Sequence, residues 1–161
     1  MPSFDVVSKV DMQEVRNAID QSMREISNRY DFKGTETKVA LNDEGISVES
    51  ASDHRVDAAV DVLKTRLVRR NVSLKSLGGG EIKPAAGGRS RALFTLNEGI
   101  SQDAAKELSK HIRDMDVKVK VQVQGDQLRV QAKKRDDLQA VIAELRGLDY
   151  RLPLQYVNRR D

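Results

Sequence analysis

Hydrophobic residues recur along this chain with two periods. Steps of three and four residues, as in Val15, Ile19, Met23 and Ile26, predict amphipathic helices. Strict alternation, as in Val117–Val123, predicts strands with one buried face. We expect helices within residues 11–29, 53–67, 101–115 and 136–147, and strands within 3–10, 35–41, 46–50, 72–77, 91–96, 117–124, 127–133 and 152–158.

The second half of the chain repeats the first. Leu41–Val48 corresponds to Val123–Val130, and each is a hairpin followed by a polar stretch and a helix with the same apolar spacing. Each half therefore reads β-α-β-β-α-β, the order of a ferredoxin-like domain. We predict an α+β fold of two tandem ferredoxin-like domains, in which helices cover one face of each antiparallel sheet.

The two repeats are separated by a stretch without hydrophobic periodicity. Residues 78–90 contain Gly78–Gly80, Pro84 and the pair Gly87-Gly88. Because Gly and Pro interrupt regular structure, we expect a flexible linker or an exposed loop. The predicted organisation is repeat 1 over 1–77, a linker over 78–90 and repeat 2 over 91–161.

Composition excludes several classes of protein. The chain has no cysteine, which rules out disulfides, thiol catalysis and thiolate metal sites. The first residues, MPSFDVVSKVD, carry charge too early for a signal peptide, and no apolar run approaches a membrane span. A cytoplasmic location is expected. Residues 81–161 hold 16 basic and 12 acidic residues, whereas 1–80 hold 12 and 13, so the second half is the better candidate for an anionic partner.

The strands expected at 117–124 and 127–133 carry the most informative polar pattern. Their outward positions hold only Lys, Arg and Gln, among them Lys118, Lys120, Arg129 and Lys133. Such a face offers many donors to phosphate oxygens. The alternative is the solvated outer face of a sheet, protected at its edge by lysines. No aromatic residue lies at these positions, so base stacking is not expected there.

Three cations, Lys133, Lys134 and Arg135, directly precede a helix start that Asp136 is expected to cap. A helix N-terminus with adjacent cations attracts an anion. The alternative is that Asp136 and Asp137 already satisfy the first amides.

Two further places hold candidate cations. At the exit of the first helix, Tyr30 offers a surface for stacking a base and Lys33 a contact for a phosphate; the alternative is a packed helix end with Phe32 buried. Near the chain end, Arg160 lies either in a frayed tail or at the lip of a site.

Catalytic and metal motifs are absent from the sequence. His54 and His111 lie in no metal-ligand spacing. There is no P-loop, no Gly-x-Ser-x-Gly and no dinucleotide-binding glycine pattern. We therefore expect no catalytic residue, no metal and no cofactor, and the protein is not expected to be an enzyme.

Several segments in order resemble one family along the whole chain. They are Met1–Ser8, Arg29–Gly34, Gln124–Asp126 with Arg129-Val130, Lys133–Gln139, and Pro153–Tyr156 through Arg160-Asp161. Together they resemble the YajQ family of bacterial nucleotide-binding proteins.

The resemblance implies tandem ferredoxin-like domains whose first strands are exchanged, so that 3–10 completes the second sheet and 91–96 the first. It also implies binding of GTP-like nucleotides or tRNA, and in some members of cyclic di-GMP together with a transcription regulator. No enzymatic activity comes with it.

We thus expect a non-enzymatic nucleotide- or RNA-binding protein, and the resemblance implies a receptor for cyclic di-GMP or a GTP-type nucleotide as its more specific form. The alternative is a protein-interaction adaptor that partners a transcription regulator. The candidate phosphate-binding residues are Lys33, Lys118, Lys120, Arg129, Lys133, Lys134, Arg135 and Arg160.

Overall fold

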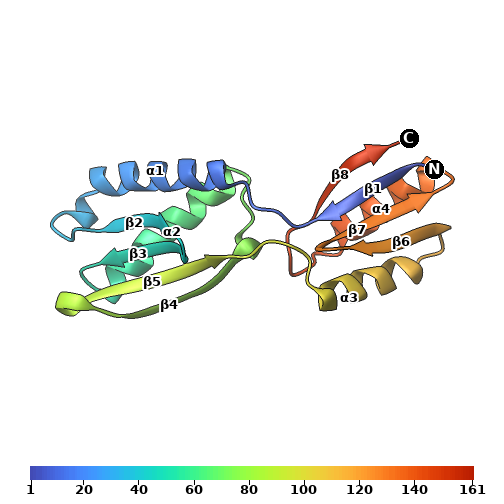
Figure 1. Ribbon diagram of the computed structural model, residues 1–161. Coiled ribbons are helices and arrows are strands. Elements are labelled where there is room, and N and C mark those ends of the chain that lie inside the picture. The colour runs from blue at the N-terminus through green and yellow to red at the C-terminus, as the bar shows by residue number, and fades with distance from the viewer. The chain divides into compact units, whose positions relative to one another are not determined.

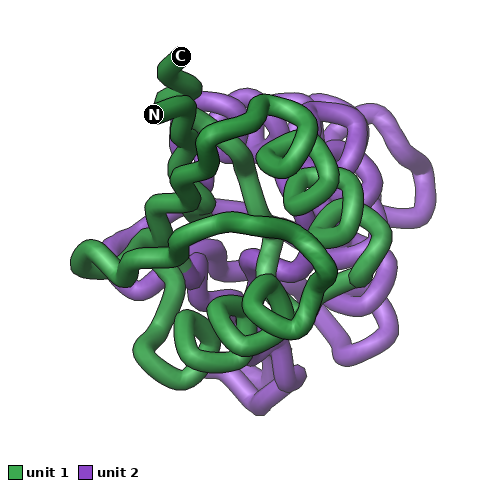
Figure 2. Tube along the Cα trace, turned by 90° about the vertical axis from the view of Figure 1, so that its right-hand side faces the viewer, with its two compact units in different colours: residues 1–9, 98–161 green, residues 10–97 purple.

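The computed structural model describes residues 1–161, which form two units, each with its own sheet and core. Unit 1 contains residues 1–9 and 98–161, and unit 2 contains residues 10–97 (Figure 2). Both termini therefore belong to unit 1. Each unit is a four-stranded antiparallel sheet with two helices (Figure 1). This is the α+β architecture of two ferredoxin-like domains that the sequence predicts.

Unit 2 has the strand order β2-β3-β5-β4. Its helices are α1 (Met12–Asn28) and α2 (Asp53–Arg69), and its strands are β2 (Lys38–Asn42), β3 (Gly45–Ser50), β4 (Leu77–Ala85) and β5 (Arg89–Leu96). Helix α1 begins where the Asp11 carboxylate accepts hydrogen bonds from the first amides. Helix α2 is capped by the Ser52 hydroxyl, one residue before the predicted Asp53.

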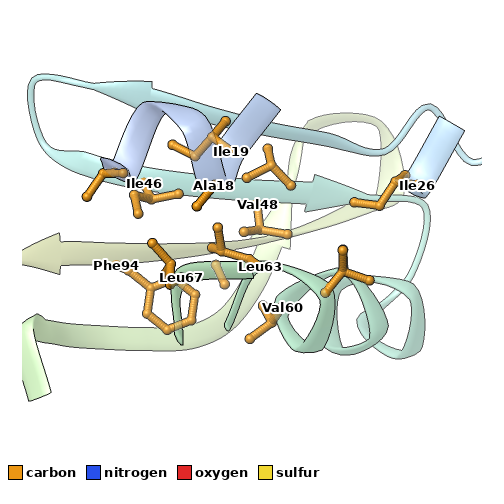
Figure 3. Packing of buried hydrophobic residues seen from close by; sticks show 14 of the residues in the cluster. Ala18, Ile19, Ile26, Ile46, Val48, Val60, Leu63, Leu67 and Phe94 are labelled. Atoms are coloured by element: carbon orange, nitrogen blue, oxygen red, sulfur yellow. The ribbon is translucent and has the colours of Figure 1, made fainter. Parts of the chain in front are cut away.

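The core of unit 2 lies between its helices and one face of its sheet (Figure 3). Ile46 and Val48 point inward from β3, and Leu63 and Leu67 from α2, and all four are fully buried. Burying each such side chain stabilises the unit by about 1.5–3 kcal/mol. The opposite face of the sheet is left for polar residues.

The glycine-rich segment is a strand, so the predicted linker over 78–90 is wrong. Residues 77–85 form β4, which pairs with β5, and a short turn at Ala86–Gly88 joins the two. The register shifts between Gly79 and Ile82, as in a β-bulge. Gly80 has φ of 90°, and a Cβ there would overlap the Phe94 ring. The glycines thus permit a bulge and a close approach, while the edge position of β4 tolerates a proline.

Unit 1 has the strand order β6-β7-β1-β8. Its strands are β1 (Ser3–Val7), β6 (Val119–Gln124), β7 (Gln127–Ala132) and β8 (Gln155–Arg160), and its helices are α3 (Gln102–Arg113) and α4 (Arg135–Gly147). Phe4 from β1 and Leu128 and Val130 from β7 pack with α3 and α4 in a second core. No helix in either unit combines the length and the apolar composition of a membrane span.

The first strand of the chain lies in the sheet of the later elements. In β1, Phe4 faces Val130 of β7, and Val6 faces Tyr156 of β8. In unit 2 the equivalent place, between β3 and β4, is taken by β5. This is the exchange implied by the resemblance. The unit boundaries therefore fall at 9/10 and 97/98, and not at 77 and 91.

Candidate functional site

Four lysines gather around one groove of unit 1, between the start of β6 and the start of α4. The groove has a volume of about 700 Å³. We call it the lysine groove. Its lining residues are Met1, Met115, Asp116, Val117, Lys118, Val119, Lys120, Gln131, Lys133, Lys134 and Asp137.

The β6–β7 ladder brings these lysines together. Val119 faces Ala132 across the ladder, and Lys120 faces Gln131. The residues that flank the first pair, Lys118 and Lys133, therefore come side by side at the end of the ladder. Because Ala132 points into the core, alternation turns these lysines to the opposite face. Lys134 follows at the junction with α4.

The lysines of the lysine groove form no ion pair within the protein. Its four lysines are exposed. The ion pairs of unit 1 join other residues, namely His111 with Glu144, Arg129 with Asp5, Arg135 with Asp161 and Arg151 with Glu107. Two acids nevertheless line the groove, Asp116 before β6 and Asp137 in α4. The groove thus combines four ammonium groups with two carboxylates.

The start of α4 adds backbone donors beside the lysines. The N-cap residue is Lys134, whose side chain makes no capping hydrogen bond. Asp136 was expected to cap this helix, but it lies within the first turn together with Asp137. The first amides of α4 therefore have no side-chain cap, and the positive end of the helix dipole lies next to Lys133 and Lys134.

Arg129 is bound within the protein. Its Nε and Nη2 donate to the Asp5 carboxylate over 2.9 and 3.4 Å, and the Asn158 amide donates to Asp5 over 2.8 Å. Asp5 is only 3% exposed. The Arg129 hydrogen bond, helped by Asn158, holds the pKa of the Asp5 carboxyl below its usual value although burial acts in the opposite direction. Strands β6 and β7 carry no acidic residue on the sheet face that holds Arg129, but the neighbouring strand β1 supplies Asp5.

Asp5 is a residue that sequence reasoning missed. It lies 124 positions before Arg129, and nothing local in MPSFDVVS marks its partner. The exchange of β1 was the one available signal, because it places residues 3–7 beside β7.

Arg135 and Arg160 line a different and smaller hollow of about 200 Å³, together with Arg159. Nη2 of Arg135 lies 2.6 Å from Oδ2 of Asp161. This hollow shares no lining residue with the lysine groove.

Lys33 lies in unit 2, in a groove at the end of α1. Of the eight predicted residues, the structure thus brings together Lys118, Lys120, Lys133 and Lys134.

Comparison with known proteins adds an independent finding. The family model described as "Nucleotide-binding protein YajQ-like" matches residues 2–160. A protein of Mycolicibacterium vanbaalenii is 52% identical, with 98% of each chain covered. One of Mycobacterium tuberculosis is 51% identical over 98% of each chain, and one of Syntrophotalea carbinolica 48% identical over 99% of each. All three relatives carry the name "Nucleotide-binding protein".

Proposed function

This chain belongs to the YajQ-like family of nucleotide-binding proteins, and from this premise we propose that it binds the phosphates of a nucleotide in the lysine groove. The observation that carries the proposal is the meeting of four exposed lysines that have no carboxylate partner. Lysine ammonium groups bind phosphates as point charges, without the fixed geometry of arginine. The uncapped amides at the start of α4 favour an anion at the same place.

The volume of the groove suits a small ligand with one or two bases. Pockets for small molecules usually measure roughly 300–1,000 Å³, and the lysine groove falls within this range at about 700 Å³. A mononucleotide or a cyclic dinucleotide fits this size better than a folded RNA.

The two carboxylates give the groove a preference among bases. A carboxylate accepts two hydrogen bonds from neighbouring N–H groups, as the N1–H and 2-amino groups of guanine present them. Asp116 and Asp137 line the groove together with the lysines, and in this proposal a carboxylate accepts such bonds while the lysines hold phosphates. We therefore infer a guanine nucleotide, of the GTP or cyclic di-GMP type, as the preferred ligand.

Calorimetric titration of the full chain with cyclic di-GMP, GTP, ATP and a short RNA tests the proposal. We expect saturable binding of a guanine nucleotide, weakened about a hundredfold or more by the double change Lys133→Gln/Lys134→Gln, since each lost charge-assisted contact contributes roughly 1.5–3 kcal/mol. Lys106→Gln/Lys110→Gln removes two exposed lysines of α3 and serves as the charge-matched control. Equal affinity for the groove variant and the control would overturn the proposed site.

The RNA arm of the same experiment separates the ligand classes. If several phosphates of an RNA were neutralised, the binding constant would fall steeply with salt. Tight RNA binding with such a slope, and no binding of guanine nucleotides, would replace the nucleotide by RNA as the ligand.

A further inference from the structure

The most exposed large apolar side chain of either unit lies far from the lysine groove in sequence, in unit 2. Tyr30 is 87% exposed, whereas Phe32, two residues later, is 5% exposed and packs in the core. Both belong to the 3₁₀ turn Tyr30–Phe32, which follows α1 and leads towards β2 (Figure 1). The turn thus anchors one ring and leaves the other in water.

The turn that carries Tyr30 is held in place from both sides. The Arg29 guanidinium donates to the Asp31 carboxylate over 3.0 and 2.6 Å and lies 5.0 Å above the Phe32 ring. The Thr35 hydroxyl donates to the carbonyl of Phe32. An aromatic ring that is attached to a rigid backbone loses little conformational entropy when a ligand stacks on it.

Phosphate-binding chemistry lies beside the exposed ring. Tyr30 lines the groove at the end of α1, which has a volume of about 570 Å³ and is also lined by Lys33 and Gly34. Lys33 is exposed, and the ion pairs of Arg29, Arg66, Arg70 and Arg89 in unit 2 do not involve it. Gly34 has φ of 75°, and nothing lies within 4 Å of where its Cβ would be. A ligand therefore has open access to the peptide backbone next to the lysine.

We propose that this groove binds one nucleotide unit, with its base stacked on Tyr30 and its phosphate at Lys33 and the Gly34 backbone. An aromatic face and a neighbouring cation are the two elements with which proteins hold unpaired bases. The unit can come from a free nucleotide or from a single-stranded RNA, which present the same base and phosphate. The site lies wholly in unit 2, and it does not rest on the proposed function of the lysine groove.

Tyrosine fluorescence of the full chain provides the test. The protein has three tyrosines and no tryptophan, so no tryptophan emission masks the tyrosine signal. A base that stacks on Tyr30 is expected to quench the emission of this residue. The background is the Lys133→Gln/Lys134→Gln variant, and the probes are UMP, GMP and single-stranded U8 and A8 RNA. We expect saturable quenching that disappears in Tyr30→Ala.

Affinity measurements separate the role of the ring from that of the cation. With the probe that binds, we expect Tyr30→Ala to weaken binding about tenfold and Tyr30→Phe to stay within about twofold, because one stacked base contributes roughly 1–3 kcal/mol and needs only the ring. Lys33→Gln should reduce the slope of log affinity against log salt by about 0.7–1. Val68→Ala, at another exposed apolar residue of unit 2, is the matched control.

Quenching by the mononucleotides identifies a free nucleotide as the source, and quenching by U8 or A8 alone identifies RNA. Binding that Tyr30→Ala leaves unchanged, or no quenching by any probe, would overturn the proposal. Neither result bears on the lysine groove, because Lys133 and Lys134 are already replaced in the background variant and Tyr30 does not line that groove.

Discussion

Units 1 and 2 share one strand order but use their cations differently. In unit 2 several arginines are paired within the protein: Arg66 pairs with Glu25 over 2.8 Å, and Arg89 donates to the carbonyls of Thr35 and Glu36. In unit 1 the lysine groove keeps four cations without a carboxylate partner. The planar guanidinium suits fixed internal contacts, and the mobile ammonium suits an incoming phosphate. Unpaired charge therefore locates a candidate site better than net charge does.

The largest difference between the units should appear when the chain is divided. Residues 10–97 contain every element of unit 2, whereas residues 98–161 lack β1. We expect the fragment 10–97 to fold and the fragment 98–161 to stay unfolded in circular dichroism and NMR spectra. Adding a peptide of residues 1–9 should restore part of the chemical-shift dispersion in the NMR spectrum of the fragment 98–161. A folded 98–161 fragment without the peptide would show that β1 is dispensable to its unit.

Two phenylalanines test whether β1 and β5 play equivalent parts. Phe4 and Phe94 point into their cores from the equivalent strands and are 1% and 5% exposed. Phe4→Ala and Phe94→Ala should each lower the free energy of unfolding by about 3–5 kcal/mol. Hydrogen exchange should then show lost protection in 98–161 for the first change and in 10–97 for the second. Loss of protection in both units from one change would break the comparison.

The ion pair between buried Asp5 and partly exposed Arg129 makes the stability of unit 1 depend on pH. The folded protein lowers the pKa of Asp5 from the ordinary 3.8. The resulting stabilisation is complete above that ordinary pKa and is lost as the pH falls through the lower folded-state pKa. Asp5→Asn should cost about 2 kcal/mol at pH 7, since it removes hydrogen bonds to a charged group.

The difference in unfolding free energy between the parent and Asp5→Asn should shrink as the pH is lowered from 5 towards 2. Urea unfolding across this range measures it. Gln122→Ala, at an exposed residue of β6, is the control whose effect should not change with pH. A constant difference for Asp5→Asn would show that the carboxylate charge does not matter.

The smallest effect is expected at the paired arginines of unit 2. Arg66→Gln removes a partly exposed ion pair and should cost only about 0.5 kcal/mol. It should leave nucleotide affinity within about twofold, although it removes as much charge as a single lysine change in the groove. A tenfold loss of affinity would contradict the division between structural arginines and ligand-binding lysines.

The sequence predicts most of this fold because the apolar spacing of its helices and hairpins is regular. Alternation alone places Lys118, Lys120 and Lys133 on one face, as the ladder does. The prediction fails at β4, because the glycines that permit its β-bulge give this segment the composition of a flexible linker.

Contacts between distant segments explain the remaining differences at the candidate site. Arg129 donates a hydrogen bond to Asp5, which belongs to the first strand of the chain. Arg135 turns to Asp161, and Lys33 belongs to the other unit. Local periodicity carries no information on such pairings. The charge pattern of the sequence therefore indicates more candidate residues than the fold brings together in the lysine groove.

The position of β1 also has a consequence for biosynthesis. The strand is synthesised before the other strands of its sheet, since its neighbour β7 ends at Ala132 and its other neighbour β8 at Arg160. At roughly 5–20 residues per second, translation makes β1 wait about 6–25 s for β7. Unit 2 is contiguous and is complete well before then. A newly made chain therefore passes through a state in which unit 2 is complete while β1, with the apolar side chains of Phe4, Val6 and Val7, has no partner strand to pair with.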